Sequence, residues 1–367
     1  MSGLYIHVPF CESKCPYCAF ASAPKRPGDE EKFLRAIERE ISARRAGFDS
    51  LEGFETLYVG GGTPSVISVP AWRHVIEIIA SSIKLARRAE VTVEANPGSL
   101  TDGHLELWRA WRVTRVSVGA QSFDDGELRF LGRVHDSAQA ADAIESCLSA
   151  GFETSVDLMF GLPGQKLRDW AKTLKRALLP APGHLSIYQL AIEDGVPFAR
   201  KNLVLPDGYE QYRYAQWRLA RAGYGQYEIA SFARVRRESR HNLNYWDDGD
   251  YVGIGPSAWS NMDGRRSKNA PLLDVYSDMI CSSGSAVVYE ERLDPGPAAR
   301  QAAVLALRTR RGIDWRSFAD KHGKVFSDEV KKKLEKFPAN LVVTDAKSTA
   351  LTQAGFRVAN KVWEDII

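Results

Sequence analysis

The sequence Tyr5-Ile-His-Val-Pro-Phe-Cys11-Glu-Ser-Lys-Cys15-Pro-Tyr-Cys18 places three cysteines within eight residues, directly after a short apolar stretch. Three thiolates at this spacing on one loop can hold three irons of a 4Fe-4S cluster. The residues that follow, Ala19-Phe-Ala-Ser22, supply no fourth thiolate. The fourth iron of such a cluster is open to a substrate or cofactor, which favours cofactor binding or catalysis over simple electron transfer.

Two simpler roles fit these cysteines less well. A structural zinc site takes four protein ligands, usually from paired Cys-x-x-Cys units, and His7 falls inside the apparent first strand. A disulfide framework needs more than five cysteines in a chain of 367 residues. We therefore interpret Cys11, Cys15 and Cys18 as cluster ligands.

The remaining cysteines and most histidines show no ligand pattern. Cys147 shares an apolar helical stripe with Ile144 and Leu148, which predicts a core thiol. Cys281 lies in a Ser/Gly-rich turn and is interpreted as a free thiol. The histidines without ligand spacing are His74, His104, His184 and His322.

Composition places the chain among ordinary globular proteins. Hydrophobic residues make up 44% and charged residues 26% of the sequence. The net charge of +3 is too small to argue for a nucleic acid or a membrane surface as partner. We find no secretory leader, and the apolar run 75–86 is too short and too charged to span a bilayer. Reduced thiols and an oxygen-sensitive cluster both predict the cytoplasm.

Six strand–loop–helix units are predicted in the first two thirds of the chain, which indicates a parallel sheet with helical crossovers. The strands are rich in Val, Ile and Leu without clean alternation, as expected when both faces are covered. Six units are fewer than the eight of a closed barrel. We therefore expect an α/β fold with a partial (β/α)6 barrel, and a doubly wound sheet is the alternative. The predicted strands are 4–8, 56–59, 91–93, 115–118, 154–158 and 185–190, and the predicted helices are 29–46, 70–88, 101–111, 136–150, 165–179 and 206–222.

The barrel is assigned to residues 1–235, and two further regions follow it. Residues 236–294 form a connection that contains His241-Asn-Leu-Asn-Tyr-Trp246. Residues 295–367 change to short charged segments, which predict a small, mostly helical, winged-helix-like domain. Its expected elements are helices 298–309, 315–322 and 328–336 and small strands 340–344 and 355–358.

Polar residues and glycines recur where the predicted strands end. Gly60-Gly61-Gly62-Thr63-Pro64 follows the second strand, Glu94 the third and Gln121 the fourth, and Asp157 lies near the end of the fifth. Loops at the carboxyl ends of parallel barrel strands build active sites, and buried polar groups are costly unless paired. Taken singly, a glycine run most often marks a turn, and Glu94 has the alternative of a structural carboxylate.

The Cys-x-x-x-Cys-x-x-Cys motif with Tyr17 before its third cysteine resembles the radical S-adenosylmethionine (SAM) superfamily, in which SAM chelates the open iron. Tyr5-Ile-His-Val-Pro-Phe10 is similar to the branch that contains the oxygen-independent coproporphyrinogen III dehydrogenase HemN and the haem chaperone HemW. The partial barrel is also the fold of that family. Further motifs that match the family are the glycine run, Val93-Glu-Ala-Asn-Pro97, Gly119-Ala-Gln-Ser-Phe123, Leu131-Gly-Arg-Val-His135 and the segment around Asp157.

The resemblance implies roles for individual residues. It implies contacts to SAM from a set of strand-end residues, and contact positions beside the cluster for Tyr5 and Tyr17. Arg133 has the fork geometry that suits a carboxylate, with a surface arginine as the alternative. The SAM-contact residues implied by the resemblance are Gly61, Gly62, Thr63, Glu94, Gln121, Arg133 and Asp157.

Two features distinguish the members of this branch. The dehydrogenase resembled here continues its motif with a further cysteine, where this chain has Phe20. The His-Asn-x-x-Tyr-Trp motif is characteristic of the chaperone branch, in which the histidine, here His241, is associated with haem binding. Imidazole is a common axial haem ligand, and Tyr245 and Trp246 can stack on a porphyrin. Ala19 departs from the acidic or amide residue usual after the third cysteine.

The four arginines between Arg234 and Arg240 can pair with haem propionates, and a solvated charged loop is the alternative. The resemblance implies a radical-SAM-type haem chaperone that binds a 4Fe-4S cluster, SAM and haem. Such a protein would hand haem to a membrane-bound respiratory haemoprotein. The alternatives are oxidative decarboxylation of coproporphyrinogen III, initiated by a 5′-deoxyadenosyl radical, and a radical SAM methyltransferase or cyclase.

Overall fold

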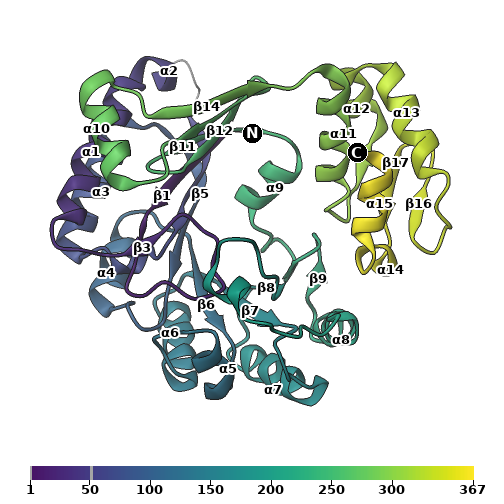
Figure 1. Ribbon diagram of the computed structural model, residues 1–367, viewed down its shortest axis with the longest axis horizontal. Coiled ribbons are helices and arrows are strands. Elements are labelled where there is room, and N and C mark those ends of the chain that lie inside the picture. The colour runs from purple at the N-terminus through teal and green to yellow at the C-terminus, as the bar shows by residue number, and fades with distance from the viewer. Residues whose placement is uncertain (1, 50–52) are drawn as a thin grey trace.

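The computed structural model describes residues 2–49 and 53–367, and Figure 1 shows an incomplete barrel beside a smaller C-terminal unit. Six parallel strands follow one another around the barrel in the order of the sequence. A doubly wound sheet reverses its strand order partway, so this order confirms the partial barrel. The six strands are β1 (Ser2–Val8), β4 (Phe54–Gly61), β5 (Leu85–Ala95), β6 (Arg115–Gln121), β7 (Glu153–Phe160) and β8 (His184–Gln189).

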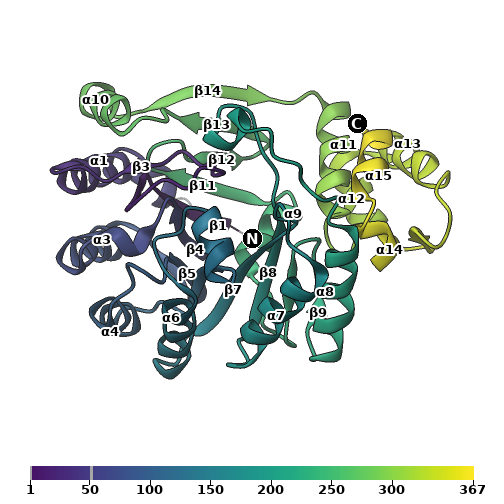
Figure 2. The ribbon, with the colours of Figure 1, turned by 60° about the horizontal axis from the view of Figure 1, so that its bottom comes forward.

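Helices form an arc on the outer face of these strands, as Figure 2 shows. Side-chain caps fix where several of them begin. Asp136 and Gln139 make a reciprocal capping box at one helix, and Thr101 caps another as its position predicted. The barrel helices are α1 (Asp29–Ala43), α3 (Val69–Ser82), α4 (Asp102–Ala110), α6 (Ser137–Ser149), α7 (Leu167–Leu178) and α8 (Tyr209–Arg221).

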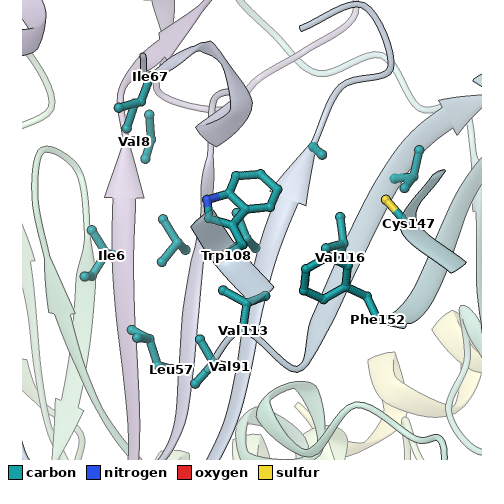
Figure 3. Packing of buried hydrophobic residues seen from close by; sticks show 14 of the residues in the cluster. Ile6, Val8, Leu57, Ile67, Val91, Trp108, Val113, Val116, Cys147 and Phe152 are labelled. Carbon is teal, nitrogen blue, oxygen red and sulfur yellow. The ribbon is translucent and has the colours of Figure 1, made fainter. Parts of the chain in front are cut away.

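The main core lies between the strands and this helical layer. Figure 3 shows Trp108 of α4 packed over strand residues such as Val116, with Cys147 of α6 close to Phe152. Cys147 is fully buried, and burial raises the pKa of its thiol to about 12, which confirms the predicted core thiol. Apolar burial of this kind contributes about 25 cal/mol per Å² and supplies most of the stability of the barrel.

The inner face of the barrel is polar, which corrects the expectation of strands without alternation. Every second residue of neighbouring strands faces a central cavity, and the intervening residues, among them Val93, Val116 and Val156, belong to the core. A period of two is the pattern of a strand with two different faces. The polar strand residues that line the cavity are Tyr58, Thr92, Glu94, Arg115, Ser117, Gln121, Ser155, Asp157, His184, Ser186 and Tyr188.

Two predicted elements are wrong in part. The helix expected over 70–88 ends at Ser82, and Leu85 begins β5, because the carbonyl of Lys84 accepts from the amide of Phe54 beside it. The strand expected over 355–358 is instead the short helix α14 (Gln353–Phe356), where the Thr352 hydroxyl accepts from the amide of Gly355. In both places a contact specified elsewhere in the chain or by a cap overrides local propensity.

The sheet also continues past both ends of the barrel, which the sequence did not predict. On one side β11 (Asp250–Ile254) pairs parallel to β1 and leads into an antiparallel extension. The His-Asn-x-x-Tyr-Trp motif forms the short helix α9 (Arg240–Trp246) before it. The extension strands are β12 (Trp259–Met262), β13 (Arg265–Asn269) and β14 (Val287–Arg292), and β10 (Ser231–Ala233) with β9 (Gly225–Gln226) forms the other edge.

A buried carboxylate fastens this extension to the barrel. Glu40 of α1 is 2% exposed and accepts from the Tyr276 hydroxyl (2.5 Å), the Asn269 amide (2.9 Å) and the Gly255 amide (2.9 Å). The Arg44 guanidinium lies 3.2 Å from the same carboxylate. Tyr276 belongs to α10 (Leu273–Ser283), which packs against α1. One carboxylate thus joins α1, α10 and the start of the extension.

The C-terminal unit has its own hydrophobic core, formed by Leu307, Phe318, Val330 and other residues between 299 and 366. Five helices and a three-stranded sheet in the order β15-β17-β16 form it, in agreement with the expected winged-helix-like fold. Among the described residues, no helix is both long and apolar enough to cross a bilayer. The elements of the unit are α11 (Pro295–Ala306), β15 (Ile313–Asp314), α12 (Trp315–His322), α13 (Lys324–Leu334), β16 (Val342–Thr344), β17 (Ser348–Leu351), α14 and α15 (Ala359–Ile366).

Replacement of Glu40 by Ala is expected to destabilise the apoprotein by about 3 kcal/mol, because it leaves the buried Tyr276 hydroxyl and the Gly255 amide without their acceptor and removes the carboxylate from the half-buried Arg44 guanidinium. The midpoint of guanidinium unfolding measures this change. Glu38→Ala on the same helix is the matched control, since that side chain is 58% exposed. A loss at Glu40 no larger than the loss at Glu38 would contradict the fastening role.

Candidate functional site

The three predicted cluster cysteines lie on one closed loop at the carboxyl end of β1. Cys11 ends the short strand β2 (Phe10–Cys11), which pairs with β3 (Ala23–Pro24) and so joins the two ends of the loop. The Lys14 ammonium donates to the carbonyls of Phe20 (3.0 Å) and Ser22 (2.9 Å) across it. All three thiols are free, partly exposed and line the same cavity.

The glycine run at the end of β4 supports this loop from below. The amide of Gly62 donates to the Val8 carbonyl (2.7 Å), and the amide of Thr63 donates to the Phe10 carbonyl (2.6 Å). A β-carbon on Gly62 would collide with that Phe10 carbonyl oxygen. Gly61 has a φ of 109°, which favours glycine, and its amide donates to the Glu94 carboxylate (3.1 Å). The glycines therefore permit close approach to the cysteine loop as well as to a ligand.

Two enclosed carboxyl groups face the cavity, which has a volume of about 340 Å³. Glu94 accepts from the Tyr58 hydroxyl (2.7 Å), and burial raises the pKa of its carboxyl to about 7. Asp157 accepts from the Ser117 hydroxyl (2.9 Å), and burial raises the pKa of its carboxyl to about 6. A positively charged ligand group would stabilise the ionised form of both.

Arg133 connects the cavity to the cysteine loop. Its Nη1 donates to Cys15 Sγ (3.6 Å) and its Nη2 donates to the Gly119 carbonyl (2.9 Å). Its Nε is buried and has no hydrogen-bond partner in the described structure, so a donor remains for a ligand. Gln121, beside it, has a left-handed φ of 63°, a conformation that is uncommon for a residue with a side chain.

The donor set fits a 4Fe-4S cluster with SAM. Among the described residues no group of three His, Cys, Asp or Glu side chains is arranged to hold a single metal ion, whereas in a cluster each cysteine binds a different iron. The Arg133 guanidinium beside Cys15 suits an electron-rich cluster. Glu94 and Asp157 suit the ammonium and sulfonium groups of SAM, and the free donor of Arg133 suits a carboxylate.

Most of the predicted site residues meet at this one cavity. Its lining includes Tyr17 and every SAM-contact residue implied by the resemblance, whereas Tyr5 and His241 lie outside it. Sequence reasoning missed inward residues such as Tyr58, Ser117 and Tyr188. The period of two in the strands could have found them, since each lies two or four residues from a predicted site residue or faces one across the barrel.

The predicted haem histidine lies at the opposite end of β1 and β4 from the cysteine loop. His241 is 1% exposed, its Nδ1 is 2.8 Å from Thr56 Oγ1 and its Nε2 is 2.9 Å from the Tyr245 hydroxyl. Its ring stacks on Tyr58 at 5.0 Å between centroids. Burial lowers the pKa of the imidazole to about 3, so the ring is neutral. Both ring nitrogens thus have partners within the protein.

Three of the four arginines from Arg234 to Arg240 also have partners within the protein. Arg237 forms an ion pair with Glu153, and Arg240 forms one with Glu55 at 3.3 Å. Arg234 lies over the Tyr224 ring at 5.1 Å. Their pairing with propionates stays a hypothesis. Trp246 stacks on the Arg308 guanidinium at 4.4 Å, so its indole joins α9 to the C-terminal unit.

Replacement of Gly62 by Ala is expected to cut iron incorporation to less than about a third of the wild-type value, because the new methyl group pushes the Phe10 carbonyl and the cysteine loop away. Iron and acid-labile sulfide per chain after anaerobic reconstitution measure this. Gly225→Ala is the control, since that glycine also lacks a positive φ and the nearest atom lies 3.9 Å from its new methyl group. Full iron content in the Gly62 variant would contradict the supporting role.

The family model and the most similar proteins found by comparison agree with one another. The family model described as the radical SAM superfamily matches residues 5–177. Haem chaperone HemW of Lactococcus lactis subsp. lactis is 30% identical over 378 residues, covering 100% of this chain and 97% of that protein. HemW of Bacillus subtilis is 31% identical, covering 99% and 98%. HemW of Escherichia coli is 37% identical over 271 residues, covering 72% and 71%.

A solved structure supports the same fold. Coproporphyrinogen III oxidase (HemN) from Escherichia coli, described as a radical SAM enzyme, has a TM-score of 0.87 and covers 100% of this chain and 89% of its own. Its sequence identity of 23% carries the fold alone. Together with the relatives above, these findings lead to one conclusion. The chain belongs to the radical SAM superfamily, in its HemN/HemW branch.

Proposed function

We propose that this protein is a haem chaperone of the radical SAM type, which binds a 4Fe-4S cluster, SAM and haem. The observation that carries the proposal is its similarity to proteins named haem chaperone over practically the whole of both chains. Phe20 adds a second argument, because it replaces the further cysteine that the resemblance associates with the dehydrogenase. This side chain is 65% exposed, so packing alone does not explain an aromatic residue there.

Different residues around the cavity would bind the cluster and SAM. Cys11, Cys15 and Cys18 hold the cluster, and Tyr17 lies in the lining beside them. The cluster and SAM, when bound, supply one-electron chemistry. Glu94 holds the ammonium group of SAM and Arg133 its carboxylate. The other proposed SAM contacts are Gly61, Gly62, Thr63, Gln121 and Asp157.

The proposal extends to location and partners. The protein would act in the cytoplasm and deliver haem to a membrane-bound respiratory haemoprotein. His241 would contribute to haem binding, and Tyr5 would support the region beside the cysteine loop through its hydroxyl, which lies 3.0 Å from His7 Nδ1. The proposed function requires neither a nucleic acid as partner nor a membrane-spanning segment.

Oxidative decarboxylation of coproporphyrinogen III is the second candidate function. The same cavity beside the cysteine loop, with its two carboxyl groups, would hold SAM for this reaction too. The similarity to coproporphyrinogen III oxidase concerns the fold alone, and this chain has Phe20 where the resemblance associates the dehydrogenase with a further cysteine.

A paired experiment distinguishes the two functions. Protein reconstituted anaerobically with iron and sulfide is titrated with haem, and in parallel is supplied with coproporphyrinogen III, SAM and a reductant. The chaperone proposal predicts saturable haem binding, one per chain, and no release of carbon dioxide. Turnover of coproporphyrinogen III would overturn the proposal, and so would the absence of haem binding.

SAM is expected to bind about tenfold more tightly at pH 8 than at pH 6. Glu94 must be ionised to hold the ammonium group, and its pKa of about 7 means that most of it is protonated at pH 6. Calorimetric titration of the cluster-loaded protein measures this. Glu94→Gln should bind weakly with little dependence on pH. Glu145→Gln, on the exposed side of α6, is the control and should keep the wild-type profile. A wild-type affinity that does not change with pH would contradict the assignment of Glu94.

A further inference from the structure

Two further cavities lie beside the barrel cavity, on the same face of the sheet and along its extension. One, of about 490 Å³, is lined by residues 19–21 of the cysteine loop together with Tyr5, Tyr245 and Trp259. The other, of about 440 Å³, continues past Tyr245 and Trp259 to Leu305 of α11. The two cavities share Tyr245, Tyr251 and Trp259 and therefore adjoin, and together we call them the aromatic groove.

The walls of the aromatic groove are flat rings on one face of the sheet. Gly3 of β1 pairs with Tyr251 of β11, which places Tyr5 and Tyr251 on the same face. The rings of Tyr245 and Tyr251 meet edge to face at 4.7 Å. Trp259 is 37% exposed, and Phe20, at the end nearest the cysteines, is 65% exposed. Large aromatic rings left open to solvent around one depression indicate a ligand-binding surface.

Two cations complete the groove. Lys268 pairs with Trp259 across β12 and β13, and its ammonium lies 5.4 Å from the centre of the Trp259 ring. Arg266, two residues away on the same face, donates to Gln301 (2.6 Å) and lies 3.8 Å from Glu291. Lys268 has no carboxylate partner among the ion pairs of the described residues, so its charge is available to an anionic ligand group.

We propose that the aromatic groove is the haem-binding site, with the macrocycle against Tyr245, Tyr251 and Trp259 and a propionate paired with Lys268. This inference rests on the proposed chaperone function and assigns a place to it. A porphyrin is flat and apolar over its faces and anionic at one edge. The groove offers aromatic walls and a cation at one rim, and each of its two parts has the volume of a small-molecule site.

The same assignment gives His241 a role without a bond to iron. Its ring lies behind Tyr245, and its Nε2 is hydrogen-bonded to the Tyr245 hydroxyl. His241 is therefore a positioning residue that fixes the Tyr245 ring in the groove wall. The haem-site assignment also explains the location of Phe20. Its side chain lines the groove as well as the cluster cavity.

Haem titration of four variants tests the site. Trp259→Leu should weaken haem binding about tenfold and Lys268→Gln about fivefold, since each removes one of the groove's recognition elements. Trp217→Leu on α8 and Lys172→Gln on α7, which are 53% and 76% exposed and lie outside the groove, should bind haem like wild type. Wild-type affinity in both groove variants would overturn the groove assignment, whereas failure of the wild-type protein to bind haem would overturn the proposed function instead.

The dimethyl ester of haem isolates the propionate contact. It should bind the wild-type protein about as weakly as haem binds Lys268→Gln, and the Lys268 substitution should cause no further loss with the ester. An equal loss for haem and its ester would contradict the pairing with Lys268.

The absorption spectrum tests the positioning role of His241. In the haem complex of His241→Gln, the Soret maximum should match that of wild type even though the affinity is lower. Tyr245→Phe, which removes only the hydroxyl that contacts His241, should lower the affinity by a similar factor. A shifted Soret maximum in His241→Gln together with an unchanged affinity in Tyr245→Phe would show that His241 ligates the iron and would overturn this role.

Discussion

The cysteine loop depends on the close packing of a glycine strand end beneath it. The amides of Gly62 and Thr63 donate to the carbonyls on either side of Pro9, and no side chain fits between the two segments. Because β1 and β4 are neighbours in a parallel sheet, this packing also fixes the loop over the open end of the barrel. The carboxylate of Glu94 then lies against the Gly61 amide. The cysteine loop, the glycine run and the Glu94 carboxylate therefore form one packed unit.

The six strand–helix units and the polar residues at the ends of their strands were predictable from the sequence. Both depend on local signals, namely the order of apolar segments along the chain and the residue types that follow them. The polar inner face was not recognised, although Ser155, Asp157 and Met159 in β7 show the period of two that a cavity-facing strand requires. The sheet extension carries no local signal. Its attachment depends on Glu40 meeting Tyr276 and Asn269, which lie more than 200 residues away in the chain. Contacts of that range follow from tertiary packing, which spacing in the sequence does not encode.

The two ends of the barrel have different chemistry. The carboxyl end carries thiols, a guanidinium and two carboxyl groups whose pKa values burial raises, all around one cavity. The amino end carries His241 and its hydroxyl partners, with an imidazole whose pKa burial lowers to about 3. The resemblance implies a haem contact for His241, and in the structure its ring is buried and hydrogen-bonded to the Tyr245 hydroxyl. Between the two ends Tyr5, Tyr58 and Tyr245 form a continuous aromatic contact with His241.

We propose that SAM and haem bind at two separate sites of this chain, SAM in the cavity inside the barrel and haem in the aromatic groove beside it, with the cysteine loop between them. Measurement of SAM affinity in the presence and absence of saturating haem distinguishes two separate sites from one shared site. Separate sites predict one SAM and one haem bound to the same chain, with neither displacing the other. Competitive displacement of SAM by haem would place both ligands in the barrel cavity and would contradict the two separate sites.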